Sequence, residues 1–166
     1  LYGQESIPST WAMANMNMVI HDMEGEIELD DTMRRPKFKT ENKLKKFDRV
    51  ITNPMWNQDI FSKTDYENDE FNRFTAGMPP EDKADWGWVQ HVLSSLKNKG
   101  RAAIVLDTGA VSRGSNIEQK SKEKEIRKWF VNKDYIESIL YLPENLFYNT
   151  PAPGVIIFLN KNKSEK

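Results

Sequence analysis

Residues 102–106 read Ala-Ala-Ile-Val-Leu, a run of apolar side chains with no polar interruption. Such a run is typical of a strand that is buried on both faces, as in a parallel sheet with helices on either side. Apolar residues upstream recur on one helical face, and Gly100 follows them as the expected end of that helix. These helical positions are Val89, Val92, Leu93 and Leu96. A helix followed by a buried strand favours an α/β architecture.

The rest of the chain continues this alternation of helices and strands. The expected elements are a helix from Ser9 to about Asp22, strands over 27–29 and 47–52, a helix over 118–130, and strands over 136–142 and 155–159. The loop between the last two strands has no room for a helix, so these strands are expected to pair as an antiparallel hairpin at one edge. The predicted fold is an α/β domain with a mostly parallel sheet.

Composition excludes several classes of function. The chain has no Cys, which removes disulfides, thiolate catalysis and cysteine metal sites. Its two histidines, His21 and His91, are not at metal-ligand spacing, and His91 falls in the apolar-faced helix, where a structural role is expected. The net charge of −1 means that a nucleic-acid role requires a local basic patch. No apolar run approaches the ~20 residues that a membrane span needs, so we expect a soluble, cytoplasmic protein.

The sheet topology indicates where a ligand is expected to bind. In open α/β sheets the ligand lies beyond the carboxyl ends of the strands. The loops at that side are those after Gln4, Leu29, Thr52, Leu106 and Leu142. The strand that ends at Thr52 is expected to be a central one, so the residues after it are the first candidates for chemistry.

Those residues are Asn53-Pro54-Met55-Trp56. Taken alone, they fit an ordinary Asn-Pro turn with a tryptophan packed nearby. They also fit a specific chemistry, because the exocyclic amine of adenine is a poor nucleophile that two hydrogen-bond acceptors would activate. The side-chain carbonyl of Asn53 and the backbone carbonyl of Pro54 are suitable acceptors, and the proline ring stiffens the backbone. Trp56 offers a ring on which an extruded base can stack, worth ~1–3 kcal/mol per base.

This tetrapeptide resembles the Asn-Pro-Pro-aromatic motif of amino-methyltransferases. Further segments are similar, in chain order, to the modification (M) subunit of type I restriction-modification systems. They are Tyr2-Gly3-Gln4-Glu5, Met16-Asn17-Met18, Trp88-Val89-Gln90-His91, residues 100–106, and residues 142–150 followed by Pro153. The resemblance covers nearly the whole chain. It implies a Rossmann-like sheet, S-adenosylmethionine as cofactor, adenine in DNA as substrate, and specificity (S) and restriction (R) subunits as partners.

The resemblance also implies roles for residues outside the tetrapeptide. Glu5 would bind the ribose hydroxyls of S-adenosylmethionine, Ile7 would pack on its adenine ring, and Asp31 would accept a hydrogen bond from its amine. The residues expected to shape the pocket for the target base are Phe147, Asn149, Thr150 and Pro153. Without the resemblance, these are a common surface acid, a helix-entry residue, a turn acid and a hairpin connection.

Two departures from the family pattern qualify these expectations. Met55 stands where the motif has its second proline, although the acceptor attributed to this step is the Pro54 carbonyl. The family's glycine-rich cofactor loop is expected before Leu1, and no Gly-x-Gly occurs in the chain. We therefore expect residues 1–166 to be a single domain, the larger C-terminal part of a catalytic domain without its first strand. Such a chain is expected to bind S-adenosylmethionine weakly or not at all.

Basic residues and other functions leave alternatives open. Eight Lys or Arg lie between Met33 and Arg49; phosphate contact is one interpretation, and a solvated connector is the favoured one. Arg113 and the lysines of 120–124 lie on the expected ligand side of the sheet. The same fold and motif type also serve protein-glutamine and RNA-adenine methyltransferases. A non-catalytic nucleotide-binding scaffold is the alternative from another class.

Overall fold

The computed structural model describes residues 1–41, 43–59, 64, 67–114 and 121–162. The chain divides into two units, Leu1–Lys45 and Lys46–Lys166, and each is described by itself. The expectation of a single domain over the whole chain therefore stays a prediction. Within the described ranges, no helix combines the length and the apolar composition that crossing a membrane requires.

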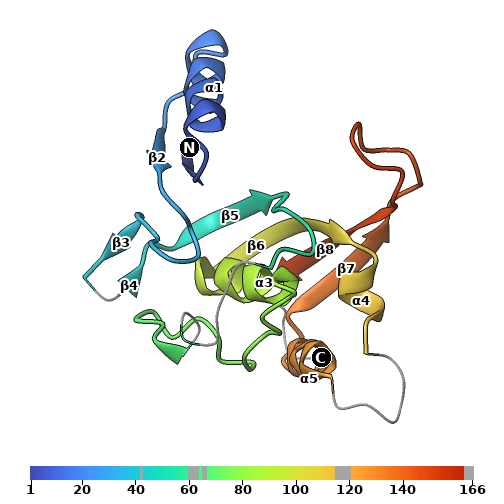
Figure 1. Ribbon diagram of the computed structural model, residues 1–166. Helices are drawn as coiled ribbons and strands as arrows, with labels where there is room; N and C mark the ends of the chain where they lie inside the picture. Colours follow the sequence, from blue (N-terminus) through green and yellow to red (C-terminus); the bar gives the residue numbers. More distant parts are fainter. Residues whose placement is uncertain (42, 60–63, 65–66, 115–120, 163–166) are drawn as a thin grey trace. The chain divides into compact units, whose positions relative to one another are not determined.

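The first unit is built on a short parallel strand pair. Its elements are β1 (Tyr2–Glu5), α1 (Pro8–Ile20), β2 (Glu26–Leu29), β3 (Lys39–Thr40) and β4 (Lys43–Leu44). Helix α1 leads into β2 (Figure 1), and β2 pairs in parallel with β1, so that Glu5 lies opposite Leu29 at the carboxyl ends of both strands. Gly25 precedes β2, where a Cβ would collide with the Leu1 carbonyl and the Met18 methyl group. The close approach of the chain to α1 therefore requires a glycine at this position.

Helix α1 differs from its expected form at its start. It begins at Pro8, with Ile7 as the N-cap residue and no side-chain cap, so the expectation that Ser9 caps it is wrong. Proline suits the first helical position because its fixed φ is already helical and its missing N–H has no intrahelical acceptor there. Met18 is buried, whereas Val19 is 82% exposed.

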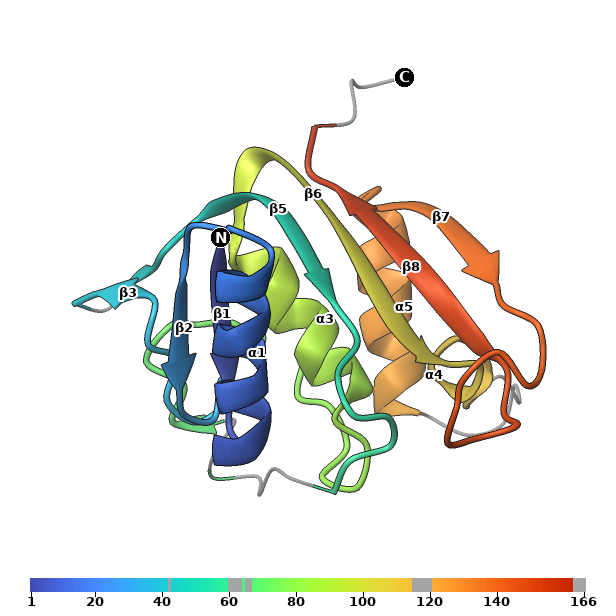
Figure 2. The same cartoon turned by 90° about the horizontal axis from the view of Figure 1, so that it is seen from above.

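The second unit is a four-stranded mixed sheet with helices. Its elements are β5 (Phe47–Thr52), α3 (Asp85–Ser94), β6 (Leu96–Asp107), α4 (Gly109–Ser112), α5 (Lys122–Asn132), β7 (Ile136–Tyr141) and β8 (Gly154–Asn160). The strand order is β5-β6-β8-β7; β5 pairs with β6 in parallel, and β8 pairs with both β6 and β7 antiparallel. Figure 2 shows β8 between β6 and β7. The predicted antiparallel edge hairpin is confirmed.

Helices α3 and α5 lie on the same side of this sheet, and the core is between them and the strands (Figure 1). Trp86 of α3 and Phe130 of α5 are fully buried and meet with their ring centroids 5.3 Å apart. Along β6, Ala102, Ile104 and Leu106 are buried, but the side chains between them are only half-buried. The expectation that both faces of this strand are equally buried is therefore not met. The other face carries exposed residues such as Ile51 of β5 and Leu140 of β7.

The end of α3 and the place of β5 in the sheet also differ from expectation. Helix α3 ends at Ser94, and Gly100 lies inside β6 instead of ending the helix, because β6 already begins at Leu96, opposite Phe47 of β5. Strand β5 is an outer strand of the four-stranded sheet and not a central one. The described part of the last helix begins at Lys122, and residues 118–120 of its predicted range lie outside the described residues.

Candidate active site

The tetrapeptide Asn53–Trp56 directly follows β5. Asn53 is exposed, Pro54 is buried, Met55 is 65% exposed, and Trp56 is half-buried against the core. The indole Nε1 of Trp56 donates a hydrogen bond to Oδ1 of Asn53 over 3.2 Å. The amide of Asn53 thus faces away from the interior, and its oxygen is oriented by the tryptophan.

The ring of Trp56 contacts Phe147, which belongs to the loop between β7 and β8. Their ring centroids are 4.8 Å apart and their planes stand at 86°, an edge-to-face pair. Gly154, the first residue of β8, lies beneath both rings, because a Cβ there would be 3.0 Å from Phe147 and 3.2 Å from Trp56. Two segments that are far apart in sequence therefore meet at one place beside the carboxyl end of β5.

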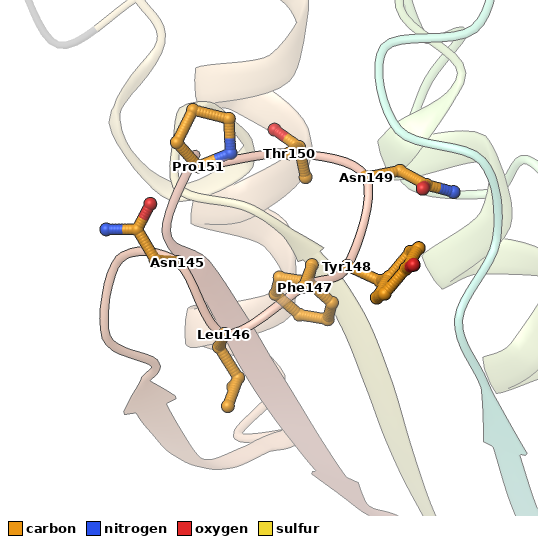
Figure 3. Close-up of a pocket in the computed structure, with 7 residues that line it drawn as sticks. All are labelled: Asn145, Leu146, Phe147, Tyr148, Asn149, Thr150 and Pro151. Carbon is orange, nitrogen blue, oxygen red and sulfur yellow. The ribbon is translucent and has the colours of Figure 1, made fainter.

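The loop that carries Phe147 also encloses a hollow of about 640 Å³ (Figure 3). Its lining residues are Asn145, Leu146, Phe147, Tyr148, Asn149, Thr150 and Pro151. Figure 3 shows Tyr148 and Asn149 pointing away from Asn145 and Leu146. Thr150 stabilises the loop, since its Oγ1 accepts a hydrogen bond from the Ala152 amide over 3.1 Å.

The structure brings together only part of the group predicted for the target base. Phe147 meets the tetrapeptide through Trp56, and Asn149 and Thr150 line the hollow. Pro153 is half-buried next to Gly154. The functional roles of these residues stay predictions.

The residues predicted to bind the cofactor lie in the first unit. Oε1 of Glu5 accepts a hydrogen bond from the Ile7 amide over 2.8 Å, and Oδ1 of Asp31 accepts from the Met33 amide over 2.8 Å. The Asp30 amide donates to the Glu5 carbonyl over 3.0 Å, which holds the two strand ends together. Ile7 is 50% exposed. Glu5 and Asp31 thus lie at the same edge of the β1–β2 pair.

Each of these two carboxylates retains an oxygen that can accept a hydrogen bond from a ligand. Among the described residues, nothing donates to Oε2 of Glu5 or to Oδ2 of Asp31. A ribose diol and an aromatic amine both need such acceptors. The acceptor oxygens at this edge therefore fit the nucleoside part of S-adenosylmethionine.

Asp30 has a different role from its neighbour Asp31. It forms ion pairs with Arg35 at 2.7 Å and with Lys37 at 3.0 Å. The Arg35 hydrogen bond, followed by those from the Asp31 amide and Lys37, holds the pKa of Asp30 well below its usual range. Two residues of the basic stretch, Arg35 and Lys37, are therefore engaged in ion pairs within this unit.

The second unit contains a charged cluster that the sequence did not predict. The guanidinium of Arg113 pairs with Asp85, with Glu123 at 2.9 Å and with Asp107 at 3.3 Å. Burial lowers the pKa of Arg113, but the hydrogen bond and charge of Glu123 and the charge of Asp85 more than offset this and raise it. Burial also raises the pKa of Asp85, whose side chain is fully buried. Arg113 is thus engaged by carboxylates and is not available to a phosphate.

His91 is not part of this cluster or of the tetrapeptide. Its Nδ1 accepts a hydrogen bond from Nη1 of Arg73 over 3.2 Å. Burial, and then the charges of Arg73 and Lys46, lower the pKa of His91 to about 3. The ring is neutral at pH 7, and the residue is half-buried, which agrees with the structural role expected for it.

The mixed sheet with its edge hairpin, and an Asn-Pro-x-Trp segment directly after a strand, agree with the class of S-adenosylmethionine-dependent methyltransferase folds. Residues 1–166 match the family model described as N-6 DNA Methylase, and the chain belongs to that family.

Two curated relatives support the same conclusion. The type I restriction enzyme MjaVIII methylase subunit of Methanocaldococcus jannaschii is 41% identical over 175 residues, which cover 100% of this chain and 29% of the relative. The HindI methylase subunit of Haemophilus influenzae is 34% identical over 168 residues, covering 100% of this chain and 35% of the relative. The chain thus spans about a third of the length of the curated relatives it matches.

Solved structures confirm the fold. The type I restriction-modification methyltransferase subunit from Streptococcus thermophilus superposes with a TM-score of 0.80 at 29% identity, covering 98% of this chain and 34% of that one. The type I restriction enzyme EcoKI M protein superposes with a TM-score of 0.72 at 26% identity, covering 98% and 31%. The resemblance to type I modification subunits is therefore confirmed.

Proposed function

We propose that this chain forms part of the catalytic domain of an adenine-specific DNA methyltransferase, the modification subunit of a type I restriction-modification system that acts in the cytoplasm. Membership of the N-6 DNA methylase family supports the reaction, and relatives named as type I methylase subunits support the system. The single observation that carries the proposal is the arrangement of Asn53 and Trp56 at the end of β5, beside Phe147.

Asn53 and Pro54 act on the amine of a flipped adenine. Oδ1 of Asn53 already accepts a hydrogen bond from Trp56, but an amide oxygen has two lone pairs, so one remains for the adenine N–H. The Pro54 carbonyl provides the second acceptor. Together they draw electron density toward the nitrogen at the moment it bonds carbon, when charge develops on it.

Trp56 and Phe147 hold the base. Extruding a base from duplex DNA costs a few kcal/mol, and stacking on an aromatic ring returns ~1–3 kcal/mol per base. Met55, in place of the second motif proline, lies largely in solvent and offers apolar surface beside the base. Asn149 and Thr150 supply polar groups at the rim of the same loop.

Glu5, Ile7 and Asp31 bind the nucleoside part of S-adenosylmethionine. When bound, S-adenosylmethionine would supply an electrophilic methyl group to the adenine nitrogen. The electron pair of the carbon–sulfur bond would stay with the sulfur, and the nitrogen would lose a proton to water. The remaining oxygens of Glu5 and Asp31 accept from the ribose and from the amine of the cofactor. Because no Gly-x-Gly occurs in residues 1–166, we expect these residues alone to bind the cofactor weakly. Micromolar binding in calorimetry would contradict that expectation.

The experiment that tests the function is labelled methyl transfer to three substrates. The methyltransferase that carries these residues is assembled with a specificity subunit and a restriction subunit, its proposed partners. The complex is incubated with labelled S-adenosylmethionine and, separately, with duplex DNA, RNA or protein. We expect label in DNA, on adenine. Label in RNA or on glutamine would support the alternative substrates of the same fold, and no label in any substrate would support a non-catalytic scaffold.

A further inference from the structure

One residue directly after the tetrapeptide is held from three sides. The backbone N–H of Asn57 donates to Oδ1 of Asp85 over 3.1 Å, its Nδ2 donates to Oδ2 of Asp107, and its Oδ1 accepts from Nη1 of Arg113 over 2.9 Å. Its φ is +53°, in the left-handed region, which asparagine tolerates better than most residues. The side-chain oxygen, the side-chain nitrogen and the backbone N–H of Asn57 thus all form hydrogen bonds, directly next to Trp56 in the chain.

The groups that hold Asn57 come from separate elements. Asp85 is the first residue of α3, and Asp107 is the last residue of β6. Arg113 follows α4 and is bonded to the same two carboxylates and to Glu123 of α5. The network is therefore closed: each anchor of Asn57 is itself fixed by the guanidinium of Arg113.

We infer that Arg113 is a positioning residue, which holds the segment Asn53–Trp56 in place through Asn57. The effect of Arg113 on catalysis rests on the proposed function. Its role in holding the segment rests only on the hydrogen bonds and ion pairs described above. Among the described residues, no hydrogen bond or ion pair joins Arg113 to Asn53 or Trp56, so it acts through the residue that follows them.

Charge explains why an arginine is needed at this place. Asp85 is fully buried and Glu123 is 4% exposed, so without a cation these carboxylates face one another across a poorly solvated space. Repulsion would then displace Asp85 and Asp107, which are two of the anchors of Asn57. Lysine supplies the charge but lacks the planar fork that contacts two carboxylates and an amide together.

The first test is local amide hydrogen exchange of the methyltransferase that carries these residues, read in peptides that span residues 55–57. The variants are Arg113→Met, Arg113→Lys and Asn57→Gly; glycine keeps the left-handed backbone accessible but removes the side-chain amide. The matched control is Arg101→Met, because Arg101 is 57% exposed and its nearest carboxylate, Glu137, is 3.6 Å away.

We expect exchange at 55–57 to rise about tenfold in Arg113→Met and Asn57→Gly, which is the factor for 1.4 kcal/mol of lost protection. Arg113→Lys should be intermediate, and Arg101→Met should match the wild type. Strand β8 should keep its protection in all of them. Unchanged exchange at 55–57, or an equal rise throughout the unit, would overturn the inference. Asn57→Gly keeps the test decisive if Arg113→Met does not fold.

The second test measures methyl transfer by the same variants in the methyltransferase. A misplaced Asn53 should lower kcat by about tenfold to a hundredfold while the KM for S-adenosylmethionine changes by less than about twofold. If exchange at 55–57 rises in an Arg113 variant while its kcat stays unchanged, the positioning role is overturned. If the wild type itself transfers no methyl group to DNA, the proposed function fails, whereas the exchange result still decides whether Arg113 holds the segment.

Discussion

The indole Nε1 of Trp56 donates a hydrogen bond to the side-chain oxygen of Asn53 over 3.2 Å. This bond fixes which end of the Asn53 amide accepts and which end donates. The tryptophan consequently has two separable contributions: its N–H orients the catalytic amide, and its ring provides a stacking surface beside Phe147.

Replacing Trp56 by phenylalanine should separate these contributions. Phenylalanine keeps a ring beside Phe147 but loses the N–H, so kcat should fall about tenfold while DNA affinity changes little, because a neutral hydrogen bond contributes ~0.5–1.5 kcal/mol. Trp56→Ala should weaken DNA binding as well, by ~1–3 kcal/mol of lost stacking. Steady-state kinetics and fluorescence-anisotropy titration measure the two quantities.

Trp88→Phe is the matched control for this prediction. The Nε1 of Trp88 is buried and has no hydrogen-bond partner among the described residues, so its removal costs no bond. If Trp56→Phe and Trp88→Phe behave alike, the Trp56–Asn53 bond has no part in catalysis.

Gly154→Ala should disturb the contact between Trp56 and Phe147. An added Cβ would lie 3.0 Å from Phe147 and 3.2 Å from Trp56, closer than ordinary van der Waals contact. Both rings must shift, and we expect a loss of about 1–3 kcal/mol in the free energy of unfolding, together with reduced turnover.

Gly3→Ala provides the comparison for Gly154. A Cβ at Gly3 would lie 3.7 Å from Ile27, an ordinary contact, so its effect on stability should be within about 0.5 kcal/mol. Urea denaturation measures both variants. Equal stability of the two would show that the rings above Gly154 have room to spare.

His91 should make the stability of the chain depend on pH. Burial and the charges of Arg73 and Lys46 lower the pKa of His91 to about 3 in the folded state, below the value of 6.5 that an exposed histidine has. The unfolded state therefore binds a proton at higher pH than the folded state, so the stabilisation is complete above about pH 6.5 and is lost as the pH falls toward 3. The slope in this window should approach 1.4 kcal/mol per pH unit.

His91→Gln should flatten this dependence, because glutamine does not titrate and still offers an acceptor to Arg73. Urea denaturation at pH 7, 6 and 5 compares the two chains. A wild type and a variant with the same pH slope would contradict the assignment of this loss to His91.

The strands that the sequence predicted well are those with a local signal. Residues 47–52, 136–142 and 155–159 carry β-forming apolar residues bounded by turn residues, and each forms a strand with nearly the expected limits. The early part of β6 carries no such signal, because Lys97, Asn98 and Lys99 are polar. They lie at an irregular stretch of the strand, between its Phe47↔Leu96 and Arg49↔Arg101 pairs with β5.

The candidate site likewise has one part that local sequence predicts and another that only the folded chain reveals. Asn53–Trp56 was found from its position after a strand, which is a local property. The network around Arg113 joins residues 57, 85, 107, 113 and 123, which no spacing rule brings together. The contact of Trp56 with Phe147 likewise depends on a glycine at position 154 and on the strand order of the folded sheet.

The central claim is that the amide of Asn53 activates the amine of adenine. Its most direct test is mass-spectrometric measurement of N6-methyladenine in DNA after incubation with the wild-type methyltransferase, with Asn53→Ala and with the surface control Asn98→Ala. We predict that Asn53→Ala lowers kcat by at least about 10²–10³-fold, as the loss of one catalytic hydrogen-bonding group does elsewhere. S-Adenosylmethionine affinity should stay nearly unchanged, and Asn98→Ala should match the wild type. Normal amounts of N6-methyladenine from Asn53→Ala would contradict the account.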